Sequence, residues 1–271
     1  MVLPEKMKDF YFENRIFYRK NKFKKSRKTL VFVHGISGSS AAWIPYEKKF
    51  ERNYNVLSFD LRGHGKSFKP KNYEDYTIKK FAEDLYSLVK HKNIKNFVLV
   101  CHSYGAFIGL EFLKKHQKLA NSAILLSPAY KAPSNRMSLL IKRLLKSKRL
   151  LNIIPLKKDY GSHVDYSKHK NTGDWNISRL IDDVGNTGLK IYLWGTKQSY
   201  NFNAEKFLNK IKIPTLLVHG KKDTIFPYEI SVEMKNKIKN SKLVLLDDAD
   251  HIIVLNNFKE VSRLMEKFLK N

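Results

Sequence analysis

Ser103 stands where a predicted buried strand meets a helix, in the segment 100–106 that reads VCHSYGA. A sharp strand-to-helix turn strains the backbone of a serine, raises its hydroxyl above the sheet and points a helix N-terminus at developing negative charge. The small neighbours Cys101 and Gly105 make such a turn sterically feasible, so we predict that Ser103 is a nucleophile. Two alternatives stay open: Ser103 as an ordinary helix N-cap, and Cys101 as the reactive group rather than a packed thiol.

Candidate partners for this serine follow two later predicted strands. Asp223 lies in HGKKDTIFP, and His251 lies in DADHII after the last strand. A histidine can take the serine proton during attack and return it to the leaving group, while an aspartate fixes its tautomer and stabilises the imidazolium. Ser103, Asp223 and His251 are therefore predicted to form a catalytic triad, which requires no cofactor and no metal. Three carboxylates near His251 compete with Asp223 for the position of the acid: Asp247, Asp248 and Asp250.

Short apolar runs alternate with longer segments of helical period along the chain. Buried strands are predicted at 9–17, 16–23, 29–33, 55–59, 96–100, 122–126, 215–218 and 242–246. Crossover helices are predicted at 41–51, 77–91, 105–116, 228–240 and 257–270. This alternation predicts an α/β protein whose eight-stranded, mostly parallel sheet is flanked by helices. The candidate residues then follow the carboxyl ends of strands, where ligand sites of open α/β sheets cluster.

Two further motifs follow the third and fourth predicted strands, HGISGS at 34–39 and DLRGHGKS at 60–67. Together with the three segments above, they resemble the α/β-hydrolase superfamily over essentially the whole chain outside residues 129–210. The order Ser, Asp, His is the one associated with that fold. The sequence departs from the usual G-x-S-x-G pattern at Cys101, which replaces the first glycine. The resemblance implies an α/β-hydrolase fold with serine-based chemistry.

The resemblance also implies roles for residues around the serine. The backbone N–H groups of Ile36 and Tyr104 are expected to form the oxyanion hole, in which loss of one donor typically costs about 3 kcal/mol. His34 is expected to brace the loop that carries Ile36. His102 is expected to pack or to line the pocket, and the 60–67 loop is expected to be structural.

Residues 129–210 interrupt the alternation and predict a helical cap inserted into a hydrolase core of residues 1–128 and 211–271. Within it, 135–154 has the pattern of a basic amphipathic helix, which can cover an active-site cleft or make weak contact with an anionic membrane surface. Covering the cleft is the commoner use of a cap. Four aromatic residues either line an acyl pocket or form a small core of the cap: Trp175, Tyr192, Trp194 and Phe202.

The 271-residue chain has a formal net charge of +27, which attracts polyanions. The basic residues are spread over every segment without a nucleic-acid motif, so no specific nucleic-acid partner is expected. The first ten residues lack an apolar signal core, and no run approaches the roughly 18 apolar residues of a membrane span. The lone cysteine, Cys101, fits a reducing compartment. We expect a cytoplasmic protein, and its oligomeric state stays open.

The leading expectation is a carboxylesterase-like or lipase-like serine hydrolase that cleaves a small to medium-sized ester with an apolar group through an acyl-serine intermediate. Monoacylglycerol-type or simple carboxylic esters are the natural substrates. Thioesterase, amidase and C–C bond hydrolase activity are alternatives on the same triad, because the fold does not select among them. Epoxide hydrolases and haloalkane dehalogenases are disfavoured, since they carry aspartate where Ser103 stands. A non-catalytic ligand-binding protein of the same fold is the alternative of another class.

Overall fold

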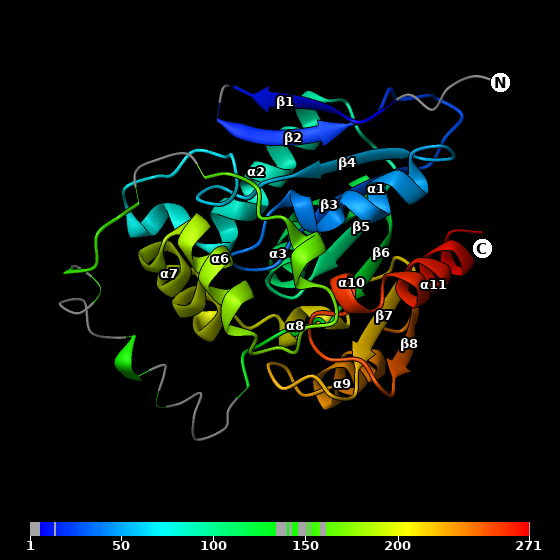
Figure 1. Cartoon of the computed structure of the whole chain (residues 1–271). Helices are drawn as coiled ribbons and strands as arrows, with labels where there is room; N and C mark the ends of the chain where they lie inside the picture. The colour runs from blue at the N-terminus through cyan, green and yellow to red at the C-terminus, as the bar shows by residue number, and fades with distance from the viewer. Residues whose placement is uncertain are drawn as a thin grey trace.

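The structure is a computed structural model that describes residues 6–13, 15–133, 140, 143–145, 151, 153–157 and 161–270. Its centre is an eight-stranded sheet in the order β1-β2-β4-β3-β5-β6-β7-β8 (Figure 1). Strands β3 to β8 pair in parallel, and β1 and β2 extend one edge in antiparallel pairing, which confirms the predicted mostly parallel sheet. The strands are β1 (Lys8–Phe12), β2 (Ile16–Lys20), β3 (Thr29–Val33), β4 (Asn55–Phe59), β5 (Phe97–His102), β6 (Ala120–Leu126), β7 (Thr215–Gly220) and β8 (Ser241–Leu246).

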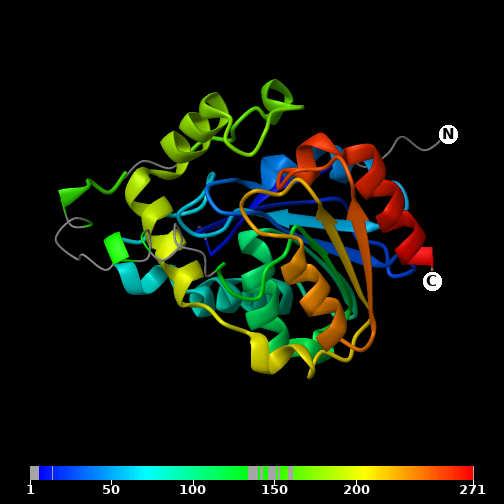
Figure 2. The same ribbon diagram turned by 90° about the horizontal axis from the view of Figure 1, so that it is seen from below.

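Helices cover both faces of this sheet, and Figure 2 shows the sheet between the two groups. Amphipathic spacing explains how they dock: α2, for example, buries Phe81, Leu85 and Leu88 and leaves charged residues in solvent. One face carries α2 (Ile78–His91), α3 (Tyr104–His116) and α9 (Glu229–Lys237). The other carries α1 (Ile44–Phe50), α10 (Ile253–Asn256) and α11 (Phe258–Lys270).

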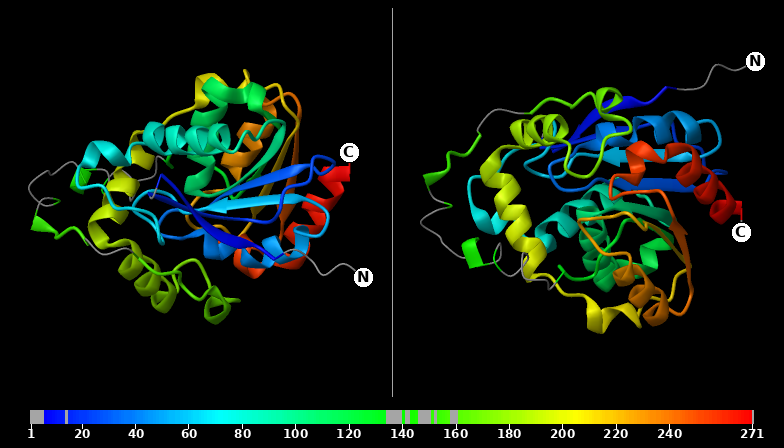
Figure 3. Two further views of the ribbon diagram at one scale, coloured as in Figure 1. Left: turned by 90° about the horizontal axis from the view of Figure 1, so that it is seen from above. Right: turned by 60° about the horizontal axis from the view of Figure 1, so that its bottom comes forward.

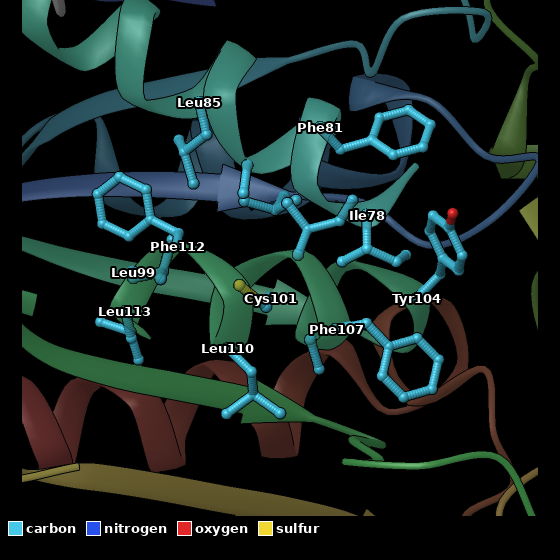
Figure 4. Close-up of a cluster of buried hydrophobic side chains, with 14 of the residues drawn as sticks. Ile78, Phe81, Leu85, Leu99, Cys101, Tyr104, Phe107, Leu110, Phe112 and Leu113 are labelled. Atoms are coloured by element: carbon cyan, nitrogen blue, oxygen red, sulfur yellow. The ribbon is translucent and has the colours of Figure 1, made fainter. Parts of the chain in front are cut away.

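The central strands are apolar on both sides because each side faces a layer of helices. Successive side chains of a strand point to opposite faces. In β3, Val31 and Val33 join the hydrophobic cluster under α2 and α3, whereas Leu30 and Phe32 join the cluster under α1 and α11. Figure 4 shows part of the first cluster, where side chains of α2 and α3 close over β5. The two clusters hold rigid the strand ends that carry the candidate site.

The spans predicted for β3 and β4 are confirmed, but several other boundaries were wrong, and local chemistry explains two of them. The predicted strand 9–17 is interrupted because Glu13 adopts a φ of +49° and the N–H of Arg15 donates to the carbonyl of Phe12, so β1 ends there. The predicted helix 41–51 divides into a 3-10 turn, η1 (Ser40–Trp43), and α1. Pro45 lies in the first turn of α1, where its missing N–H has no helical acceptor in any case.

Between β6 and β7 the described residues form a 3-10 turn η4 (Tyr166–His169) and the helices α6 (Ile177–Thr187), α7 (Leu189–Asn201) and α8 (Glu205–Leu208). Figures 1 and 3 place α6 and α7 to one side of the sheet, beyond the end to which β4 points. Gly188 joins these two helices with a φ of +98°, a conformation that favours glycine.

The stretch 135–154 lies largely outside the described residues, so its amphipathic helix stays a prediction. Within the part of the chain that the structure describes, no helix combines the length and apolarity needed to cross a membrane.

Candidate active site

Ser103 occupies the turn between β5 and α3, with a φ of +53° and a ψ of −119°. This conformation is strained for a residue with a side chain. Its side chain makes no N-cap hydrogen bond to the helix, so the structure does not support the N-cap interpretation. A Cβ on Gly105 would lie 2.6 Å from the carbonyl oxygen of Val33, and glycine therefore lets α3 approach β3 closely. The turn presents the serine hydroxyl at the carboxyl end of the sheet.

Cys101, two residues before the serine, lies in the hydrophobic cluster beneath α3 (Figure 4). Its Sγ is 2.6 Å from the position that a Cβ on Gly109 would take, so glycine makes room for the sulfur. Burial raises the pKa of the Cys101 thiol well above its usual range. The thiol is therefore neutral and packs as a small apolar group, and it is poorly suited to act as a nucleophile.

His251 connects the serine to a carboxylate. Its Nε2 lies 2.6 Å from Ser103 Oγ, and its Nδ1 lies 2.7 Å from Asp223 Oδ2. An ionised Asp223 accepts a hydrogen bond from Nδ1–H, which leaves Nε2 free to accept from the serine hydroxyl. The structure thus brings together the three residues singled out from the sequence, although they come from turns after β5, β7 and β8.

Asp223 is held as an ionised acceptor by its surroundings. Its Oδ1 accepts from the N–H groups of Ile225 (2.9 Å) and Phe226 (2.8 Å), and its Oδ2 accepts from His219 Nε2 (2.9 Å) besides His251. Burial alone would raise the pKa of Asp223, but the charge of His251 and hydrogen bonds from His219 and His251 outweigh it and lower that pKa below its usual value. The carboxylate is therefore charged throughout the neutral range.

The three competing carboxylates point elsewhere. Asp247 and Asp248 form surface ion pairs with Lys221 and Lys222. Asp250 accepts from the N–H of Ile252 at 2.9 Å and from an asparagine side chain nearby. None of the three makes a hydrogen bond to His251 in the structure, whereas Asp223 does.

The loop that carries Ile36 is braced by His34. The Nε2 of His34 accepts from the N–H of Leu61 at 3.0 Å, and its Nδ1–H donates to the carbonyl of Gly35 at 2.7 Å. Burial lowers the pKa of His34, so the ring stays neutral and keeps both bonds. Because α3 begins at Tyr104, the N–H of that residue lacks an intrahelical acceptor. Both backbone donors proposed for an oxyanion hole thus flank the serine side of the cavity.

His102, beside the serine, supports the histidine loop. Its Nε2 lies 3.0 Å from the carbonyl oxygen of His251. Burial, reinforced by the nearby His251, lowers the pKa of His102 to about 3, so the ring is neutral and donates to that carbonyl. His102 also lines the cavity, so packing and pocket lining are both observed.

Ser103 and His251 open onto a cavity of about 410 Å³, within the roughly 300–1,000 Å³ typical of small-molecule sites. Its apolar walls come from both the sheet side and the 129–210 segment. Phe107, Phe226 and Leu255 contribute from the sheet side, and Leu180 and Leu193 contribute from α6 and α7. Among the described residues, no group of three or more His, Cys, Asp or Glu side chains is placed to hold a metal ion.

The four aromatic residues singled out between 129 and 210 divide between two roles. Trp175 and Tyr192 line the cavity. Trp194 packs instead against Tyr73 and Tyr76, with ring centroids 5.9 and 5.2 Å apart, and Phe202 packs against Phe107 at 5.2 Å. The two interpretations from the sequence therefore each hold for part of the set.

Two residues that support the site were missed from the sequence. His219, at the end of β7, accepts from the Ser231 hydroxyl and donates to Asp223. Its position four residues before the candidate acid was an available signal. Asp174, between η4 and α6, offered no such signal because its partners lie far away in sequence.

Asp174 links the loops that carry the acid and the histidine. Its Oδ1 accepts from the N–H of His251 at 2.8 Å, and its Oδ2 accepts from both the N–H and the hydroxyl of Thr224, at 2.9 and 2.7 Å. The side chain is buried, at 5% exposure. One carboxylate thus fixes the backbone of His251 and that of the residue next to Asp223.

Comparisons with known proteins agree with this architecture. The profile of the alpha/beta hydrolase fold family matches residues 28–258. The probable lysophospholipase BODYGUARD 1 of Arabidopsis thaliana is 26% identical over 280 residues, which cover 89% of this chain and 59% of the plant protein. A proline iminopeptidase of Saccharolobus solfataricus is 27% identical over 277 residues, which cover 94% of this chain and 88% of that protein. The chain thus spans less than two thirds of the plant relative.

Among solved structures, MGS-M2, an alpha/beta hydrolase enzyme from a Medee basin deep-sea metagenome library, superposes with a TM-score of 0.77. The two sequences are 22% identical, and the superposition covers 97% of this chain and 98% of the other. At that identity the likeness shows the fold. Because the family profile matches residues 28–258, which carry strands β3 to β8, the chain belongs to the alpha/beta hydrolase fold family.

Proposed function

We propose that the chain is a serine hydrolase that cleaves carboxylic esters of small to medium size. Ser103 is the nucleophile, His251 the general base, and Asp223 the acid that orients the histidine. The observation that carries the proposal is the continuous hydrogen-bonded chain from Ser103 Oγ through His251 to Asp223, which ends at a cavity with apolar walls. A non-catalytic binding protein has no use for such a chain.

The geometry supports a two-step mechanism. Ser103 Oγ attacks the ester carbonyl carbon while its proton passes to His251 Nε2, and the N–H groups of Ile36 and Tyr104 bind the resulting oxyanion. The tetrahedral intermediate collapses, the C–O bond to the alcohol breaks, and His251 returns the proton to the departing alkoxide. Water then attacks the acyl-serine, gives its proton to His251, and releases the acid as the serine recovers its proton.

Two observations favour an ester among the substrates open to this chemistry. The apolar cavity walls suit an acyl chain, and the relative in Arabidopsis is named a probable lysophospholipase. The archaeal relative is named a proline iminopeptidase, so an amide is the competing substrate class.

Hydrolysis of p-nitrophenyl esters from acetate to palmitate tests the proposal. We expect Ser103-dependent turnover in which kcat/KM rises about fourfold for each methylene that enters the apolar cavity, then falls once the acyl chain exceeds the space of about 410 Å³. Palmitate should therefore be a poorer substrate than a medium-length ester. If folded wild-type protein turns over none of these esters, the ester proposal is wrong, and p-nitroanilide and thioester analogues identify the class cleaved instead.

Asp174→Asn should lower kcat for the best ester by roughly tenfold, with a smaller change in KM. An amide oxygen accepts from only one of the two backbones that the carboxylate holds, and small displacements of catalytic groups cost large factors in rate. The variant is compared with wild type by steady-state kinetics.

Asp165→Asn is the matched control, because Asp165 is an exposed acid of the same segment that also accepts from a nearby N–H. It should keep wild-type kinetics. Equal kcat values for Asp174→Asn and wild type would remove Asp174 from the positioning of the site.

A further inference from the structure

Arg179, on α6, lines the same cavity as Ser103 and is 6% exposed. Two of its three nitrogens have protein acceptors: Nη2–H donates to the carbonyl of Asp174 at 2.6 Å, and Nη1–H donates to Asp183 Oδ2 at 3.3 Å. The third nitrogen, Nε, is buried and has no acceptor among the described residues. A buried N–H without a partner is rare in native proteins and points to a group that binds there.

The charge of the guanidinium is already balanced within the cavity. Asp183 and Asp174 both line it, and Arg179 is the only Lys or Arg among its described lining residues. Asp183 Oδ1 also accepts from the Tyr166 hydroxyl at 2.7 Å, and both of its oxygens are therefore used. Burial raises the pKa of Asp183 to about 6, against the opposing effect of Tyr166 and Arg179, so the carboxylate is mostly ionised at neutral pH. A bound carboxylate would add a third negative charge to this cluster.

A second unused polar group lines the same cavity. The hydroxyl of Tyr104 is buried and makes no hydrogen bond to any described residue. Burial raises the pKa of this hydroxyl well above its usual value, so it keeps its proton and stays a neutral donor. The cavity therefore has apolar walls but offers two spare donors besides those expected around the oxyanion.

We propose that the substrate carries a second, uncharged oxygen acceptor apart from the ester that is cleaved, and that the Nε–H of Arg179 binds it. A ketone, hydroxyl or ether oxygen meets this description, since each accepts a hydrogen bond without adding charge. The inference rests on the proposed ester hydrolysis and specifies the substrate class of that site. Arg179 is then a specificity-determining residue.

Matched esters test the inference. On the acyl side, p-nitrophenyl hexanoate is compared with its 4-oxo and 5-oxo analogues and with mono-p-nitrophenyl glutarate, which places a carboxylate at a similar distance. On the alcohol side, propyl butyrate is compared with glycerol monobutyrate. We expect wild type to prefer an oxygenated ester over its alkyl partner in at least one series, and to disfavour the glutarate.

In Arg179→Met that preference should fall roughly tenfold, the factor that one buried hydrogen bond supplies, while kcat/KM for hexanoate changes little. Because Arg179→Met leaves Asp183 buried without its partner, the double variant Arg179→Met, Asp183→Asn is measured beside it and should show the same loss. Lys168→Met, which removes an exposed charge from η4, should leave the preference unchanged.

The outcomes separate the two proposals. Wild-type hydrolysis of hexanoate without any preference for oxygenated esters, or with a preference that both Arg179 variants retain, overturns the role of Arg179 and leaves ester hydrolysis standing. A clear preference for the glutarate overturns the choice of an uncharged acceptor. Failure of wild type to hydrolyse any ester removes the proposed function itself, and the inference with it.

Discussion

Ser103→Ala should reduce kcat/KM for the best p-nitrophenyl ester by a factor on the order of 10⁶, because loss of the nucleophile removes the covalent route altogether. The fold should persist. The hydroxyl of Ser103 makes one printed side-chain bond, to His251, and alanine bears the backbone strain at a φ of +53° no worse than serine does. Steady-state kinetics measures the first effect and thermal unfolding the second.

Ser127→Ala is a closely matched control for this prediction. Ser127 is also a buried serine with positive φ, at +44°, and it directly follows the neighbouring strand β6. Its hydroxyl makes no hydrogen bond to the described residues, and it does not line the cavity. Activity should survive in Ser127→Ala. Comparable activity in the Ser103 and Ser127 variants would mean that another group attacks the substrate.

Asp223→Asn should lower kcat by roughly 10⁴-fold, because an amide neither fixes the required tautomer of His251 nor stabilises its imidazolium. The pKa of Asp223 lies below its usual value, so the wild-type carboxylate is ionised at every pH where the protein works. The defect of the variant should therefore persist across the pH profile rather than disappear in acid or base. Measuring kcat against pH for both proteins tests this.

Asp248→Asn serves as the control for the acid. Asp248 also follows β8 in the sequence near His251, but it is exposed and pairs with Lys222 at 2.6 Å. Exposed ion pairs contribute little, so kinetics and stability should stay close to wild type. A large loss in Asp248→Asn, with Asp223→Asn unaffected, would show that the acid has been misassigned.

The sequence was sufficient to predict the fold class and the family resemblance, and both are confirmed. The strands of an α/β sheet buried on both faces read as continuous apolar runs, and such runs are visible in the sequence, as in TLVFV of β3. Strand boundaries were less predictable, because a turn at Glu13 depends on one residue with positive φ rather than on any period. The domain division at 129–210 and the roles of the site residues stay proposals.

Asp174 and Arg179 could not have been predicted from the sequence, and the reason is physical. Both lie in a segment whose contacts with the sheet side join residues far apart in the chain, such as Asp174 with His251 and Thr224. Local periodicity reports only which face of an element is buried. By contrast, Ser103, Asp223 and His251 each follow a strand end, and the parallel sheet brings those ends together.

The most direct test of the central claim is to treat the protein with paraoxon, then record intact mass and map the modified peptide. Attack by Ser103 Oγ on phosphorus releases one p-nitrophenolate and leaves one diethylphosphoryl group on the serine. The account predicts one such group per chain, on Ser103, and none on this site in Ser103→Ala. An adduct on another residue such as Cys101, or an unmodified Ser103 in protein that hydrolyses esters, would contradict it.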